Sequence, residues 1–167
     1  MTNSRSIAQG SHVSALVARM VQRLDRVPYA LLALPLRLAV ATVFWNSAMT
    51  KLADWNTTIS LFANDYQVPL LPPEIAAYLA ASMELTTPVL LVLGLFTRAA
   101  ALALLGMTVV IEIFIYPLAW PTHIQWAAML LILLCRGAGK LSLDELVWHR
   151  FGQRYAVPAV SAQKNEF

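Results

Sequence analysis

Four runs of apolar residues constrain the fold of this chain more than any other feature. They cover residues 29–50, 74–96, 99–116 and 122–135, the last being the shortest. An apolar segment of about 20 residues crosses a bilayer as an α-helix. The runs therefore predict an all-α integral membrane protein, built as a four-helix transmembrane bundle.

The composition agrees with lipid as the solvent. Hydrophobic residues make up 59% of the 167 and charged residues only 13%, against about 25% charged in an ordinary globular domain. The mean hydropathy is +0.62. Because the four runs use most of the chain, we expect one membrane domain over residues 29–136. Residues 1–28 and 137–167 then form surface segments at its two ends.

The positions of lysine and arginine predict how the helices are oriented. Short loops rich in these residues stay in the cytoplasm. Arg26 precedes the first run, Arg98 separates the second from the third, and Arg136 and Lys140 follow the fourth. Lys51 is the one basic residue on the opposite side. This pattern predicts an even number of crossings with both termini cytoplasmic, and it accounts for the pI of 9.3 without a nucleic-acid partner.

Both terminal segments carry patterns typical of amphipathic surface helices. Over residues 12–27, apolar residues recur at helical spacing opposite several arginines, which indicates a basic helix on an anionic leaflet. A helix packed on a partner protein is the alternative. Near the other end, Ser142 followed by Glu145 forms a capping box that starts a second helix. Between the first two runs, Trp55, Ile59 and Phe62 share a face of a short interfacial helix.

Among the polar residues inside the apolar runs, five are candidates for a site: Arg37, Asn46, Glu84, Glu112 and His123. At 1.5 Å per residue, all except Arg37 come out roughly 18 to 22 Å from the cytoplasmic boundary. Ionisable residues at such depth are costly and often functional. We therefore expect the set to form a shared intramembrane polar site, although each residue alone could make only a structural hydrogen bond.

The first helix and the second carry further polar features. Arg37 lies roughly 9 Å inside the membrane, where it could extend to the cytoplasmic face or pair with an acid such as Glu84. Lys51 is expected to extend to the headgroups. Pro88 cannot donate to the carbonyl of Glu84, so a kink there would expose a backbone acceptor beside the carboxylate.

The residue types limit the chemistry of the polar site. Cys135 is the one cysteine, which excludes an internal dithiol relay. His12 and His149 lie in surface segments, so a haem with two histidine ligands is disfavoured. Glu84, Glu112 and His123 could bind a transition metal, or could form a polar pocket for a quinone headgroup. The chain has no phosphate loop, nucleophile elbow or zinc-protease motif.

Over residues 36–146 the chain resembles the DoxX family of small bacterial membrane proteins. The resemblance is carried by short pieces in a consistent order: Arg37, Phe44, Lys51-Leu52, Val68-Pro69, Glu84, Leu93-Gly94-Leu95, Thr97-Arg98-Ala99-Ala100, Met107, Gly137-Ala138-Gly139 and Leu141-Ser142-Leu143-Asp144. Ala48 and Pro88 depart from the glycines expected in this pattern, so the packing around Glu84 differs from the typical member.

This resemblance implies a four-helix protein of the bacterial inner membrane. The family is associated with redox enzymes such as thiosulfate:quinone oxidoreductase and with oxidative and metal stress systems, but it has no agreed catalytic residues. Three functions stay open: a membrane subunit of a redox system with a pocket for a quinone or a partner enzyme, a metal-handling or transport protein with a metal-related operon partner, and a ligand-free membrane anchor. Whether the chain is an enzyme is undecided.

Overall fold

The computed structural model describes residues 4–151, with side chains placed at residues 14–147 and 150, and this part is almost entirely helical without strands. The α-helices are α1 (Ser4–Asp25), α2 (Tyr29–Ala53), α3 (Trp55–Leu61), α4 (Pro73–Leu93), α5 (Thr97–Val110), α6 (Trp120–Arg136) and α7 (Leu143–Phe151). Two π-helical turns, η1 (Phe62–Tyr66) and η2 (Ile111–Ile115), extend α3 and α5.

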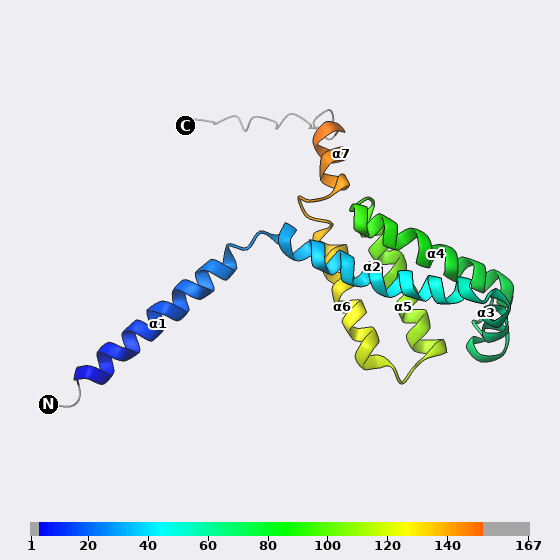
Figure 1. Cartoon of the computed structure of the whole chain (residues 1–167), viewed down its shortest axis with the longest axis horizontal. Helices are drawn as coiled ribbons and strands as arrows, with labels where there is room; N and C mark the ends of the chain where they lie inside the picture. Colours follow the sequence, from blue (N-terminus) through cyan, green and yellow to red (C-terminus); the bar gives the residue numbers. More distant parts are fainter. Residues whose placement is uncertain (1–3, 152–167) are drawn as a thin grey trace, which may run out of the picture.

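Helices α2, α4, α5 and α6 pack into a closed four-helix arrangement (Figure 1), in which each helix contacts two others. Three segments are long and apolar enough to cross a membrane: α2, α4, and α5 together with η2. Helix α6 has 17 residues and is shorter than these. The structure therefore has the expected all-α architecture of a membrane bundle, and a fourth crossing by α6 remains a prediction.

The bundle core combines a few large side chains with many alanines. Phe44, Leu91, Leu104, Leu130 and Leu133 are fully buried at its centre, and alanines of α2 and α5 lie beside them. Small residues let membrane helices approach closely. The outward faces are rich in exposed large apolar side chains, which is the surface expected of helices in contact with lipid.

At one end of the bundle, which we call the Gly94 end, residues 94–96 connect α4 to α5 and residues 137–142 pack against that turn. Gly94 has φ 66°, and a Cβ there would lie 2.6 Å from the Cβ of Ser142. Asp144 accepts hydrogen bonds from the amides of Phe96 (2.8 Å) and Thr97 (3.0 Å). The segment after α6 is therefore fixed to the α4–α5 turn by close packing and by capping of the first amides of α5.

At the opposite end, the Tyr116 end, residues 116–119 connect η2 to α6. Helix α3 and η1 lie near the start of α4, against which Phe62 is buried. This is the short helix that its aromatic pattern predicted. Asp54 caps α3, and hydrogen bonds from the Thr57 amide and hydroxyl hold the pKa of Asp54 below its usual value. The hydroxyls of Tyr66 and Tyr116 lie 3.2 Å apart and join η1 to the end of η2.

The terminal helices lie outside the four-helix arrangement. Helix α1 begins at Ser4, earlier than the predicted residue 12, and extends away from the bundle (Figure 1). Its Leu16, Met20 and Leu24 are exposed. Helix α7 begins at Leu143, where the Glu145 amide donates to the Ser142 hydroxyl at 3.3 Å, one half of the predicted capping box. Residues 152–167 of the predicted C-terminal segment lie outside the described residues.

Candidate functional site

Glu112 and His123 form a direct pair at the Tyr116 end. Glu112 lies on η2 and His123 in the first turn of α6, and the short connection between them brings the chain back antiparallel. His123 Nδ1 lies 2.5 Å from Glu112 Oε2. The two atoms are thus in direct hydrogen-bond contact, and a hydrogen bond to an ionised carboxylate is stronger than one between neutral groups. Glu112 also lies on a π-helical turn, a distortion that is frequent at functional sites.

Aromatic packing fixes the imidazole on its other side. The side chain of His123 is only 5% exposed, and its ring lies 4.9 Å from the ring of Trp126. Trp126 in turn makes an edge contact with Phe44 of α2, with ring centroids 5.7 Å apart. The imidazole is therefore held between a carboxylate and an aromatic pair that joins it to the bundle core.

The carboxylate of this pair is the more accessible partner. Glu112 is 18% exposed, and Val109, Ile113 and Phe114 around it are large, exposed apolar residues. The accessible edge of the pair therefore opens on an apolar surface. If Nδ1 donates to Glu112, the neutral imidazole keeps Nε2 as a proton acceptor. The pair can accept a proton and stabilise the resulting imidazolium.

A second buried acid, Glu84 of α4, pairs with Lys51 of α2. Lys51 Nζ lies 2.9 Å from Oε1 and 2.9 Å from Oε2 of Glu84. The hydroxyl of Ser47 donates to Oε1 at 3.0 Å and accepts from Lys51 at 2.9 Å. Oε2 has no aligned hydrogen bond, so its contact with the ammonium is purely electrostatic. Glu84 is 1% exposed, and the group links α2 to α4.

Arg37 binds backbone carbonyls at the Gly94 end. Its Nε donates to Leu91 (2.6 Å) and its Nη2 to Val92 (2.5 Å), both at the C-terminus of α4. Its Nη1 donates to Leu141 (2.7 Å) and Ala138 (3.3 Å). The last carbonyls of a helix have no partner within the helix. Arg37 therefore caps α4 and ties the segment after α6 to it.

The family model DoxX matches residues 32–117, which is just over half of the chain. This chain belongs to the DoxX family. A protein of Haemophilus influenzae, described as uncharacterized, is 32% identical over 127 residues, which are 67% of this chain and 80% of that protein. No solved structure matches the chain. Within this DoxX protein, Arg37, Lys51, Glu84 and Glu112 lie in the matched region, and His123 follows it.

The structure divides the predicted polar site of this DoxX protein into separate groups. Glu112 and His123 are brought together, Glu84 pairs elsewhere, and the side chain of Asn46 is exposed. Among the described residues, no three His, Cys, Asp or Glu side chains are grouped as metal ligands. The set of Glu84, Glu112 and His123 is thus not assembled as one metal centre.

For Arg37 the sequence left two alternatives open, extension to the cytoplasmic face or pairing with an acid. Arg37 does not pair with Glu84, because carbonyls at the Gly94 end bind all three of its nitrogens. The expectation for Lys51 needs correction. Lys51 does not extend to the headgroups, because Glu84 and Ser47 hold its ammonium inside the bundle. Sequence reasoning missed Ser47 as well, although Ser47 and Lys51 are one turn apart on the same helix face. The role of Asp144, which accepts hydrogen bonds from the first amides of α5, was also missed. The signal available for it was its position two residues after the capping Ser142.

Proposed function

We propose that this DoxX protein is the membrane subunit of a redox system and that Glu112 and His123 exchange a proton with a quinone headgroup. The observation that carries the proposal is the buried imidazole 2.5 Å from a carboxylate whose accessible edge faces apolar side chains. The chain is an integral membrane protein by its family and its apolar helices. We infer its redox role and its ligand from the geometry of this pair.

The pair has the chemistry that quinone turnover needs. A bound quinone would supply the exchange of two electrons and two protons. His123 Nε2 would accept one of the two protons from a quinol hydroxyl, and the carboxylate of Glu112 would stabilise the positive imidazolium across the Nδ1 hydrogen bond. The second proton would leave to water at the membrane surface. In the reverse direction the same nitrogen would donate one proton, and the electrons would pass to or from a partner redox enzyme.

The surroundings favour a ligand that dissolves in the bilayer. Val109, one helical turn before Glu112, and Ile113, which follows it, are 49% and 59% exposed, so the helix surface around the carboxylate is apolar. The Trp126 ring lies beside the imidazole, where it could stack on the planar ring of a quinone headgroup. Together these features support a quinone better than a hydrated ion. A metal would need further ligands beyond this one acid and this one imidazole.

A ligand-free anchor is the second candidate, and one observation favours it. Lys51 and Glu84 form a polar pair between helices whose charges compensate each other within the bundle. Glu112 and His123 could join η2 to α6 in the same way. For either function, we propose the bacterial inner membrane with both termini cytoplasmic, which the distribution of Lys and Arg supports.

The experiment compares quinone binding by the purified wild type with Glu112→Gln and His123→Gln. Native quinone is extracted and measured, and a short-chain ubiquinone analogue is titrated by equilibrium retention. Removing a charged hydrogen-bond partner costs about 1.5 to 3 kcal/mol, so each variant should bind at least about tenfold more weakly. Gln125→Ala, an exposed change on the same helix, should bind like the wild type.

Three outcomes would contradict the proposal. Folded wild type that binds neither native quinone nor the analogue would favour the anchor. Unchanged binding by both variants would show that the quinone binds somewhere other than at Glu112 and His123. A stoichiometric transition metal in elemental analysis, lost in both variants, would favour metal handling.

A further inference from the structure

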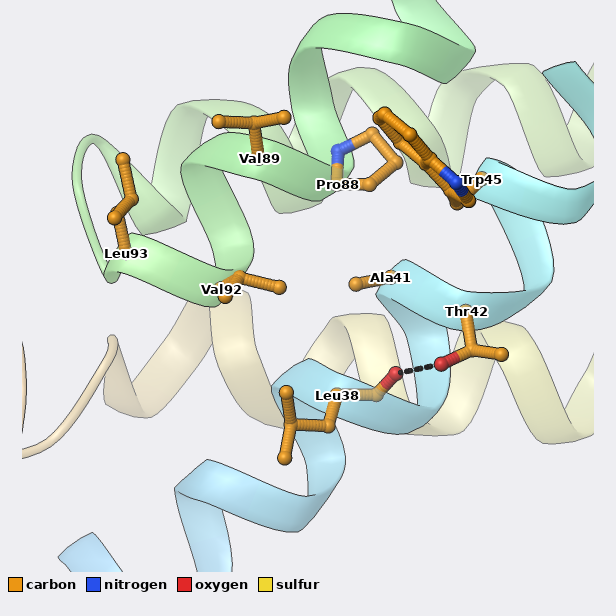
Figure 2. Close-up of a pocket in the computed structure, with 8 residues that line it drawn as sticks. All are labelled: Leu38, Ala41, Thr42, Trp45, Pro88, Val89, Val92 and Leu93. Carbon is orange, nitrogen blue, oxygen red and sulfur yellow. Dashed lines mark hydrogen bonds between the residues drawn. The ribbon is translucent and has the colours of Figure 1, made fainter. Parts of the chain in front are cut away.

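An apolar groove runs along α2 and α4 on the outside of the bundle. Figure 2 shows Leu38, Ala41 and Trp45 of α2 facing Pro88 and Val92 of α4 across it. The groove encloses about 320 Å³ and is lined almost entirely by carbon. Its one hydroxyl, that of Thr42, donates to the Leu38 carbonyl at 2.8 Å. The other side-chain donor of the lining is the indole N–H of Trp45 at one end of the groove. The groove therefore offers a fatty chain mainly apolar contacts.

The groove continues into a wider hollow at the Gly94 end. Val92 and Leu93 line both spaces, and Leu34 lies one helical turn from Leu38 of the groove. The hollow encloses about 950 Å³ and is bounded on its far side by residues 140–146, which follow α6. One continuous surface thus leads from an apolar channel between two membrane helices to a polar opening at the end of the bundle.

The hollow contains a buried positive charge without a contacting anion. Arg37 lines it and is 2% exposed, and its printed hydrogen bonds all go to neutral carbonyls. Within the described part of the chain, no carboxylate contacts the guanidinium. The C-terminus of α4 supplies about half a negative charge. Asp144 acts on Arg37 through its charge, but it directs both oxygens to the amides of Phe96 and Thr97.

A second cation, carried on a long side chain, also lines the hollow. Lys140 is exposed and lines the hollow, opposite a single acid, Glu145. Arg37 and Lys140 together therefore leave the lining with an excess of one positive charge. Basic openings between membrane helices are a recurrent binding place for anionic lipid headgroups.

We propose that this surface binds one phospholipid with an anionic headgroup. An acyl chain fills the groove between α2 and α4, and the phosphate lies in the hollow near Lys140 and Arg37. The lipid supplies the counter-charge that the carbonyls around Arg37 supply only in part. It also packs against residues 140–146, so it would hold the segment after α6 on the bundle. This site is separate from Glu112 and His123, which lie at the other end.

The test measures lipid retained by the full chain after purification and delipidation in detergent. Phosphatidylglycerol and phosphatidylcholine are added back separately, and bound lipid per protein is counted by native mass spectrometry. Retention of phosphatidylglycerol should exceed that of phosphatidylcholine. One basic residue near an anionic lipid contributes about 1 kcal/mol, so Lys140→Gln should weaken phosphatidylglycerol binding about fivefold. Arg98→Gln, which removes an exposed charge of α5 that lines neither the groove nor the hollow, should leave the bound lipid in place.

A second pair of variants tests the groove. Val92→Trp fills the junction of groove and hollow and should abolish retention, whereas Leu102→Trp, an exposed change on α5, should not. Equal retention of both lipids, or equal loss in Lys140→Gln and Arg98→Gln, would overturn the proposal by showing a non-specific lipid shell. A lipid-free wild type that is dimeric would overturn it by assigning the groove to a second copy. If Val92→Trp does not fold, the Lys140 comparison still decides.

Discussion

The Lys51 ammonium of α2 lies 2.9 Å from each carboxylate oxygen of Glu84 of α4, so one ion pair joins two helices inside the membrane bundle. The pair is asymmetric in burial, with Lys51 16% exposed and Glu84 1% exposed. Loss of Lys51 would leave the Glu84 charge buried without a counter-ion, whereas loss of Glu84 would leave a lysine whose side chain can still turn outward. This asymmetry predicts unequal effects of the two single substitutions.

Lys51→Met should destabilise the protein more than Glu84→Gln. The first leaves a buried carboxylate with only Ser47 as a partner, and breaking a buried pair in this way costs about 3 to 5 kcal/mol. The double variant should recover part of the loss, which unfolding in detergent would measure as a coupling energy. Strictly additive losses would mean that the two residues stabilise the bundle independently.

Arg37→Lys should weaken the Gly94 end although it keeps the positive charge. A single ammonium cannot reach the four carbonyls that the guanidinium binds. Unsatisfied buried acceptors cost about 1 to 3 kcal/mol each, so we expect a loss of at least about 2 kcal/mol. Hydrogen exchange should increase in residues 137–142. Arg23→Lys on α1 is the matched control and should change neither quantity.

Reporter fusions test the orientation of the bundle. Fusions in the turn before Arg98 and after Lys164 should both report the cytoplasm, and a fusion near Asp65 should report the outside, because lysine and arginine gather on one side. An external C-terminus would mean that the 17-residue α6 does not cross the membrane.

Tyr66 should ionise at a higher pH than an ordinary tyrosine. Burial, followed by the hydrogen bond with Tyr116, raises the pKa of Tyr66. A raised pKa stabilises the fold fully below about pH 10, the ordinary tyrosine value. This contribution is lost as the pH rises from there toward the folded pKa. Phenolate absorbance in an alkaline titration should show a late step that Tyr66→Phe removes. Tyr78→Phe, at an exposed tyrosine of α4, is the control variant, and a late step of unchanged amplitude in Tyr66→Phe would contradict this assignment.

The sequence predicted the helices well and the polar contacts only in part. Runs of apolar residues and the aromatic spacing of residues 55–66 are local signals, so the bundle and α3 could be found from them. The approach of Glu112 to His123 followed from a short turn between two helices. The partner of Arg37 could not be found in this way, because backbone carbonyls carry no residue identity. Lys51 was assigned to lipid because its long side chain can extend to the headgroups, and the approach of Glu84 from another helix could not be derived from the sequence.

The shortness of α6 bears on the water around His123. Its 17 residues extend about 26 Å, whereas the hydrocarbon core of a bilayer is about 30 Å thick. A span shorter than the core is accommodated by local thinning of the bilayer. Because His123 lies in the first turn of α6, that hydrophobic mismatch would draw the aqueous boundary toward its imidazole and shorten the route by which protons leave the membrane.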